Sequence, residues 1–254
     1  MSRPRLAYIL PNLFTAASIF TGIISLTQAA SGHYEQAAWL IFLSLVFDGL
    51  DGRIARLTHT CSRFGLEFDS LADIVAFGVA PAMLLYFQVG EHYGRFGILV
   101  SALFVVFGAI RLARFNVTDS CNEPGVFIGL PIPTAAVFIA GWSLLLVRHD
   151  WAILKPLLLV GSLMVAFLMV SNIRYPSFKK LNLDRPLMLK TLVLLTLAAS
   201  LLYLFSSEGL ALIILTYIFY GPIRGVRVSW ERYRRIRKIR QRRRHRNEET
   251  AEEF

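Results

Sequence analysis

The sequence is poor in cysteine, in paired histidines and in repeats. Its 254 residues include two cysteines, Cys61 and Cys121, and five scattered histidines, none at metal-ligand spacing from another. We predict that both cysteines face the cytoplasm, where thiols stay reduced, so no disulfide is expected. We find no internal repeat and no RNA-binding signature, so nucleic acid is not expected as a partner.

Acidic residues are also scarce, and they are unevenly placed. Five of the 17 lie in the C-terminal tail, and five of the remaining 12 fall within 26 residues: Asp48, Asp51, Glu67, Asp69 and Asp73. A carboxylate at membrane depth costs about 2.5–3.5 kcal/mol. Repeating this cost in one short stretch predicts that the stretch binds a cation, and divalent metal ions prefer oxygen ligands.

Apolar residues dominate the rest of the chain. The sequence is 55% hydrophobic, with a mean hydropathy of +0.54. Long apolar runs separated by short charged or Gly/Pro-marked breaks predict an all-α integral membrane protein. We expect eight spans: 8–29, 36–57, 68–88, 96–115, 127–147, 152–171, 187–206 and 209–224.

Basic residues predict the orientation. With the N-terminus in the cytoplasm, 24 of the 27 Lys and Arg lie on the inner side, and only Arg95, Arg148 and Lys155 lie outside. This places the acidic cluster and both termini in the cytoplasm. No targeting segment is evident beyond the spans, so we expect a prokaryotic inner (cytoplasmic) membrane.

The chain divides into a transmembrane catalytic domain, 1–230, and a basic tail, 231–254. The tail carries ten Lys or Arg and five Glu. Because it follows a predicted span directly, we expect it to rest on anionic lipid head groups, although it could also serve only as a topology anchor.

The spacing of the acids predicts where they meet. Asp48 and Asp51 are three residues apart and Asp69 and Asp73 four apart, so each pair lies on one helical face. A reversal around residues 57–66 would bring the two faces together. Four carboxylates at such an interface can hold two divalent ions about 3.5–4 Å apart, an arrangement that serves phosphoryl chemistry.

The residues between the acids fit an anionic ligand. Gly52, Ala55 and Gly65 would let a phosphate approach the backbone closely, and Arg56 offers donors suited to phosphate oxygens. The alternative is structural: each Asp would pair with a neighbouring Arg, and the small residues would serve helix packing alone. Glu67 lies on another face and is expected to be only a neighbour of the site.

The stretch Asp48-x-x-Asp51-Gly52-x-x-Ala55-Arg56, eight residues, Gly65-x-x-x-Asp69-x-x-x-Asp73 resembles the signature of the CDP-alcohol phosphotransferases, without departure in spacing or identity. The resemblance implies a membrane enzyme with a six-helix core, here extended by about two C-terminal helices, that forms a homodimer. It implies two Mg²⁺ or Mn²⁺ ions held by Asp48, Asp51, Asp69 and Asp73, with Asp73 also the general base. The residues it assigns to CDP-diacylglycerol are Asn12, Thr15, Gly52, Ala55, Arg56, Ser62 and Gly65.

Three further segments resemble the branch of this family that uses serine as acceptor: 68–82, 111–117 and 129–136. We expect Arg111 and Arg114 to bind the serine carboxylate, although both could be positive-inside anchors. Asn116 and Thr134 are possible polar contacts. Pro131 and Pro133 are expected to break or bend the fifth span.

The resemblance implies transfer of the phosphatidyl group from CDP-diacylglycerol to L-serine, giving phosphatidylserine and CMP by in-line displacement. Within the same chemistry, the alternative acceptor is glycerol 3-phosphate or another polar alcohol. An ion-coupled transporter is the alternative from another class, because intramembrane acids also mark cation pathways.

Overall fold

The described part of the chain is a bundle of helices. The computed structural model describes residues 6–58, 60, 62–118, 126–149, 151–176, 209, 215, 216 and 218. His59, Cys61, Cys121, the predicted seventh span and the basic tail lie outside these residues. The predicted eighth span is described only at four isolated positions.

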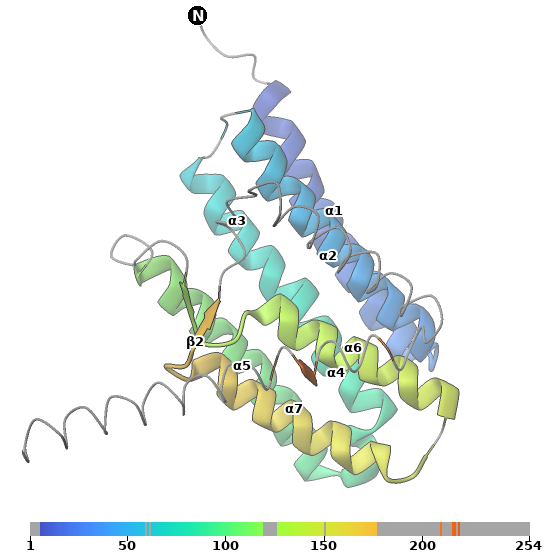
Figure 1. Ribbon diagram of the computed structural model, residues 1–254. Helices are drawn as coiled ribbons and strands as arrows, with labels where there is room; N and C mark the ends of the chain where they lie inside the picture. The colour runs from blue at the N-terminus through green and yellow to red at the C-terminus, as the bar shows by residue number, and fades with distance from the viewer. Residues whose placement is uncertain are drawn as a thin grey trace, which may run out of the picture.

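Two long antiparallel helices form one side of the bundle, α1 (Leu6–Ala30) and α2 (Tyr34–Leu57) (Figure 1). Gly32, with φ of +81°, ends α1 in a conformation that favours glycine. Buried hydroxyl groups join the two helices: Ser25 Oγ donates to the Ala37 carbonyl at 2.8 Å, and Thr21 Oγ1 lies 2.7 Å from Ser44 Oγ. These contacts fix how far α1 can slide along α2.

The next helical segment changes its winding in the middle. It consists of α3 (Arg63–Asp73), a π-helical turn η1 (Ile74–Val79) and α4 (Ala80–Gln88). The π-helical turn begins directly after Asp73, and such turns are frequent at functional sites. Gly22 of α1 packs against this turn, because a Cβ at Gly22 would lie only 2.9 Å from the Ala76 Cα.

The remaining helices cover the other side of the bundle. A 3₁₀ turn η2 (Gly90–Tyr93) leads into α5 (Arg95–Thr118), and then follow α6 (Ile132–His149) and α7 (Leu154–Val170). Helix α6 contacts α2, α4 and α7, and 11 of its 18 residues are buried. Small residues on α6, including Ala136, Ala140 and Gly141, permit this close packing.

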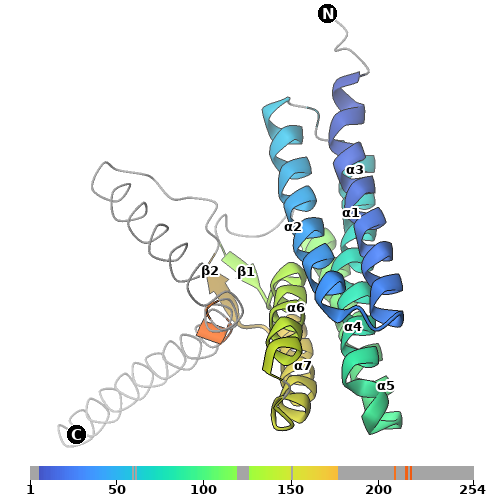
Figure 2. The same cartoon turned by 90° about the vertical axis from the view of Figure 1, so that its right-hand side faces the viewer.

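Two short antiparallel strands lie beside the ends of α6 and α7, β1 (Val126–Ile128) and β2 (Arg174–Pro176) (Figure 2). The prediction of a span beginning at residue 127 was therefore wrong by five residues. Gly129, with φ of +80°, separates β1 from the helix. The prolines do not bend α6: Pro131 precedes it and Pro133 lies in its first turn, where no intrahelical N–H is needed.

The first six predicted spans correspond to observed helices. By length and composition, four helical segments are long and apolar enough to cross a membrane: Ile9–Ala30, Arg63–Gln88, Arg95–Val117 and Ile132–His149. Helix α7 is apolar but shorter. Helix α2 is as long as the others but carries Asp48, Asp51 and two arginines near its end, which lowers its hydropathy. The helical membrane architecture is thus confirmed for the described residues, with the two short strands as an addition.

The contact between Gly22 and the π-helical turn can be tested with one methyl group. Gly22→Ala should lower the free energy of unfolding by about 1–3 kcal/mol, because the added Cβ must displace the backbone of η1. Gly49→Ala is the matched control, since a Cβ at Gly49 meets nothing within 4 Å. Thermal unfolding in detergent measures both, and a Gly22→Ala protein as stable as the control would contradict this packing.

Candidate functional site

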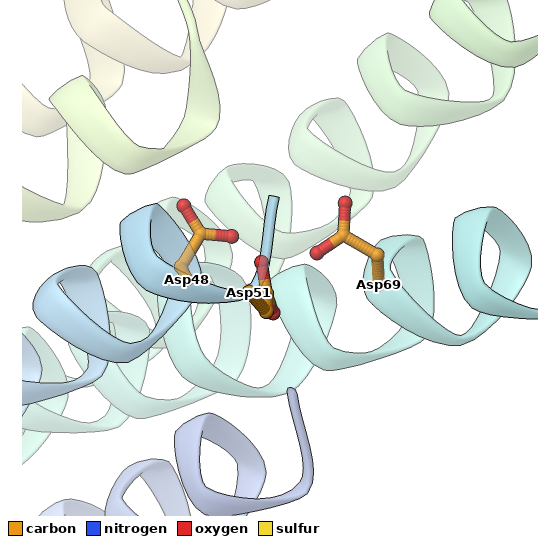
Figure 3. A group of neighbouring side chains, drawn as sticks. All are labelled: Asp48, Asp51 and Asp69. Carbon is orange, nitrogen blue, oxygen red and sulfur yellow. The ribbon is translucent and has the colours of Figure 1, made fainter. Parts of the chain in front are cut away.

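Three carboxyl groups converge where α2 meets α3. Asp48 and Asp51 come from α2 and Asp69 from α3, and one oxygen of each lies within 4.8 Å of the others (Figure 3). Asp51 is 5% exposed, while Asp48 and Asp69 are half-buried. Within the described part of the chain, none of the three forms an ion pair with Lys or Arg at N···O distances up to 4.0 Å. The arrangement therefore favours a cation site over the alternative of separate Asp–Arg pairs.

Asp73 stands next to this group and is not one of its three members. It is the last residue of α3, and its carboxyl group lies beside that of Asp48, close enough for a hydrogen bond when one is protonated. Asp73 also interacts electrostatically with Arg111 of α5, which is buried. Asp73 therefore interacts both with the acidic group and with a buried cation. Glu67 is exposed and does not join the acidic group.

Several residues predicted to bind the nucleotide form two small groups, and the first lies at the start of α3. Ser62 begins α3 as its N-cap, and its Oγ accepts a hydrogen bond from the Gly65 N–H at 3.0 Å. A Cβ at Gly65 would lie 3.2 Å from Ser62 Oγ and 3.6 Å from Asn12 Oδ1. The structure thus brings Asn12, Ser62 and Gly65 together from α1 and α3.

Gly52 and Arg56 form a second small group on α2. The Arg56 side chain is exposed and lies over Gly52, where a Cβ would stand 3.6 Å from Arg56 Nη1. Arg56 also interacts electrostatically with Asp51. Ala55 lies half-buried on the same helix. The guanidinium therefore remains accessible to a phosphate while lying close to the acidic group.

Thr15 is placed differently from the other predicted nucleotide contacts. It is 3% exposed, and its hydroxyl donates a 2.8 Å hydrogen bond to Asp51 Oδ2. The sequence motif gave no indication of this contact, because the two residues are 36 positions apart. Residues with hydroxyl groups recur along α1 at positions 15, 18, 21 and 25. This helical spacing could have indicated that one face of α1 meets a polar partner.

The three residues predicted to bind serine have distinct surroundings. Arg111 is 7% exposed, and its guanidinium carbon lies 5.3 Å from the centre of the Phe115 ring. Asn116 Nδ2 donates to Ser70 Oγ at 3.0 Å and so connects α5 to α3. Arg111 also interacts electrostatically with Asp73. Thr134 is half-buried in the first turn of α6.

Arg114 makes a set of contacts at the C-terminus of α7. Its guanidinium donates to the carbonyls of Val170 at 3.0 Å and Ser171 at 3.2 Å, and to Asn172 Oδ1 at 3.3 Å. A Cβ at Gly129 would collide with the Met169 carbonyl and lie 2.8 Å from Arg114 Nη2. These contacts favour a role for Arg114 in capping α7, and its binding of serine stays a prediction.

Comparison with known proteins finds one family and several named relatives. A model of the CDP-alcohol phosphatidyltransferase family matches residues 8–170, ending at the last residue of α7. A Helicobacter pylori protein named CDP-diacylglycerol–serine O-phosphatidyltransferase is 49% identical over 221 residues, covering 86% of this chain and 92% of that protein. A Bacillus subtilis protein of the same name is 34% identical over 172 residues, covering 67% and 92%. An archaetidylserine synthase of Methanothermobacter thermautotrophicus is 37% identical over 169 residues, covering 66% and 69%.

The capping role of Arg114 predicts a loss of stability. Arg114→Ala should lower the free energy of unfolding by about 1.5–3 kcal/mol, because charged hydrogen bonds to the α7 carbonyls are lost. Arg95→Ala, at the exposed start of the same helix, should change it by no more than about 0.5 kcal/mol. Thermal unfolding in detergent compares the two, and equal stability of both variants would contradict the capping role.

Proposed function

Because the chain belongs to the CDP-alcohol phosphatidyltransferase family, we propose that it transfers the phosphatidyl group of CDP-diacylglycerol to L-serine and releases CMP. The observation that carries the proposal is the group of three carboxylates at the junction of α2 and α3, within the region that matches the family. The names of the similar proteins from Helicobacter pylori and Bacillus subtilis support serine as the acceptor.

The acidic group fits a divalent cation. Its donors are carboxylate oxygens from three side chains, which suit Mg²⁺ or Mn²⁺. Asp48, Asp51 and Asp69 would hold the metal, and Asp73 is the proposed fourth ligand of a two-metal site. Such ions, when bound, offset the charge of the transferring phosphate and of the leaving CMP.

The nucleotide end of the donor is proposed to lie between α1, α2 and the start of α3. The exposed Arg56 guanidinium is suited to a phosphate oxygen. Gly52 and Gly65 lack the side chains that would keep a nucleotide away from the backbone. Asn12 and Ser62 lie beside Gly65 and supply hydrogen-bonding groups there.

The acceptor is proposed to bind on the α5 side of Asp73. Arg111 would bind the serine carboxylate, and its buried position makes that charge interaction stronger than it would be in water. Asp73 would accept the hydroxyl proton as the serine oxygen attacks the phosphorus of the phosphatidyl group. The bond from that phosphorus to the CMP oxygen breaks in the same step, and CMP leaves. Asn116 borders this region through its bond to Ser70.

The other readings of the sequence have less support. Glycerol 3-phosphate could also place an anionic group against Arg111, so it remains the alternative acceptor. An ion-coupled transporter is disfavoured by membership of a phosphatidyltransferase family. We further propose that the protein lies in the inner membrane as a homodimer with its site towards the cytoplasm, and that the basic tail contacts anionic head groups.

The choice of acceptor is tested by a panel assay on purified protein. Labelled CDP-diacylglycerol is offered with serine, glycerol 3-phosphate or inositol phosphate in the presence of Mg²⁺ or Mn²⁺. We expect phosphatidylserine and CMP with serine only, and no product after chelation of the metal. CMP release with glycerol 3-phosphate in place of serine would establish the alternative acceptor, and no CMP release with any acceptor would overturn the proposed reaction.

The role of Asp73 is tested by Asp73→Asn, which keeps the shape of the side chain but removes the base. Turnover should fall by about 10²–10⁴-fold, the usual contribution of a general base. Glu67→Gln is the matched control, since it removes an exposed acid from the same helix and should leave turnover unchanged. An Asp73→Asn enzyme as active as this control would remove Asp73 from the mechanism.

A further inference from the structure

We propose that Thr15 is a positioning residue for the metal ligand Asp51, and that its hydroxyl serves the carboxylate instead of the nucleotide. The proposal rests on the proposed function, in which Asp51 holds a divalent cation. Thr15 Oγ1 lies 2.8 Å from Asp51 Oδ2, and the two residues are 3% and 5% exposed. A hydroxyl that donates to an ionised carboxylate forms a charge-assisted hydrogen bond.

The single hydroxyl proton of Thr15 is committed to Asp51. Among the residues that the structure describes, its other acceptor is the Pro11 carbonyl, at the longer distance of 3.2 Å on the same helix. The carboxylate is the stronger acceptor and the nearer one, so it takes the proton. The hydroxyl therefore has no second proton to donate to a nucleotide. The side chain is also nearly inaccessible to one, at 3% exposed.

Asp51 has a hydroxyl partner in the described part of the chain that the other two members of the acidic group lack. Considering the described residues, it alone among Asp48, Asp51 and Asp69 accepts a hydrogen bond from a hydroxyl side chain. The bond uses one lone pair of Oδ2, and a carboxylate has further lone pairs that can bind a cation. It also restricts rotation of the carboxylate. Partners of this kind orient metal ligands and are needed for full metal affinity.

The scaffold holds Thr15 firmly enough for this role. As a β-branched residue on a helix, Thr15 has few side-chain rotamers. Helix α1 is fixed along α2 by the bonds of Thr21 to Ser44 and of Ser25 to the Ala37 carbonyl. Thr15 continues this buried series of hydroxyl groups toward the site. The position of its hydroxyl is therefore set by the α1–α2 interface and not by a ligand.

The test compares variants that keep or lose the donor. Thr15→Val keeps the shape and removes the hydroxyl, Thr15→Ser keeps the hydroxyl, and Thr15→Ala is a second donor-free variant in case valine prevents folding. Thr21→Val is the matched control, because it removes a buried hydroxyl from the same helix that bonds to Ser44 and not to the acidic group. Thermal unfolding of each variant confirms that it is folded.

The readout is Mn²⁺ binding to purified protein without substrate, measured by electron paramagnetic resonance. Thr15→Val should weaken Mn²⁺ binding by about 10–100-fold, whereas Thr15→Ser and Thr21→Val should bind as the unaltered protein does. At saturating Mn²⁺, the KM of Thr15→Val for CDP-diacylglycerol should be unchanged. Unaltered Mn²⁺ affinity in Thr15→Val and Thr15→Ala, or a raised KM at saturating Mn²⁺, would overturn the positioning role.

Asp51→Asn separates this proposal from the proposed function. Loss of Mn²⁺ binding in Asp51→Asn together with weaker binding in Thr15→Val supports the positioning role, even if the acceptor panel shows that serine is not the acceptor. Retained Mn²⁺ affinity in Asp51→Asn would mean that Asp51 is not a ligand, and would overturn the role of Thr15 with it.

Discussion

Mutual repulsion between Asp48, Asp51 and Asp69 is the constraint on which the rest of the structure depends. With oxygens within 4.8 Å of one another, each ionised pair is unfavourable by about 3 kcal/mol at an effective dielectric of 20. A chain that gathers such groups must hold them against this repulsion. A cation bound between the three carboxylates would attract each of them and offset their repulsion. Cation binding therefore explains the acidic group better than helix packing does.

The helices around the acidic group hold its carboxylates in place against their repulsion. Buried hydroxyl groups of α1 bond to α2 and fix the position of one helix along the other. Thr15 belongs to this series and donates to Asp51. Helix α3 changes into a π-helical turn directly after Asp73, and Gly22 lets α1 pack closely against that turn. The acidic group therefore lies between elements whose relative positions are fixed by short contacts.

The end of α5 is held by comparable contacts. Asn116 connects it to Ser70 on α3, and Arg114 connects it to the carbonyls that end α7. Arg111 lies one turn before Arg114, buried and in electrostatic contact with Asp73. In the proposed mechanism, Asp73 is the carboxyl group that interacts both with the acidic group and with Arg111.

The sequence by itself determined the helical membrane architecture, the first six spans and the acidic pairs, because hydropathy and i, i+3 and i, i+4 spacing are local properties. It missed the start of α6, where Gly129 and the pairing of β1 with β2 override an apolar run. The spacing of the acids also predicted that they would meet, and the structure confirms this for Asp48, Asp51 and Asp69. Only the tertiary structure decided that Arg114 caps α7 and that Thr15 bonds to Asp51. These last two contacts join residues far apart in the chain, and their geometry depends on helix packing that no local pattern records.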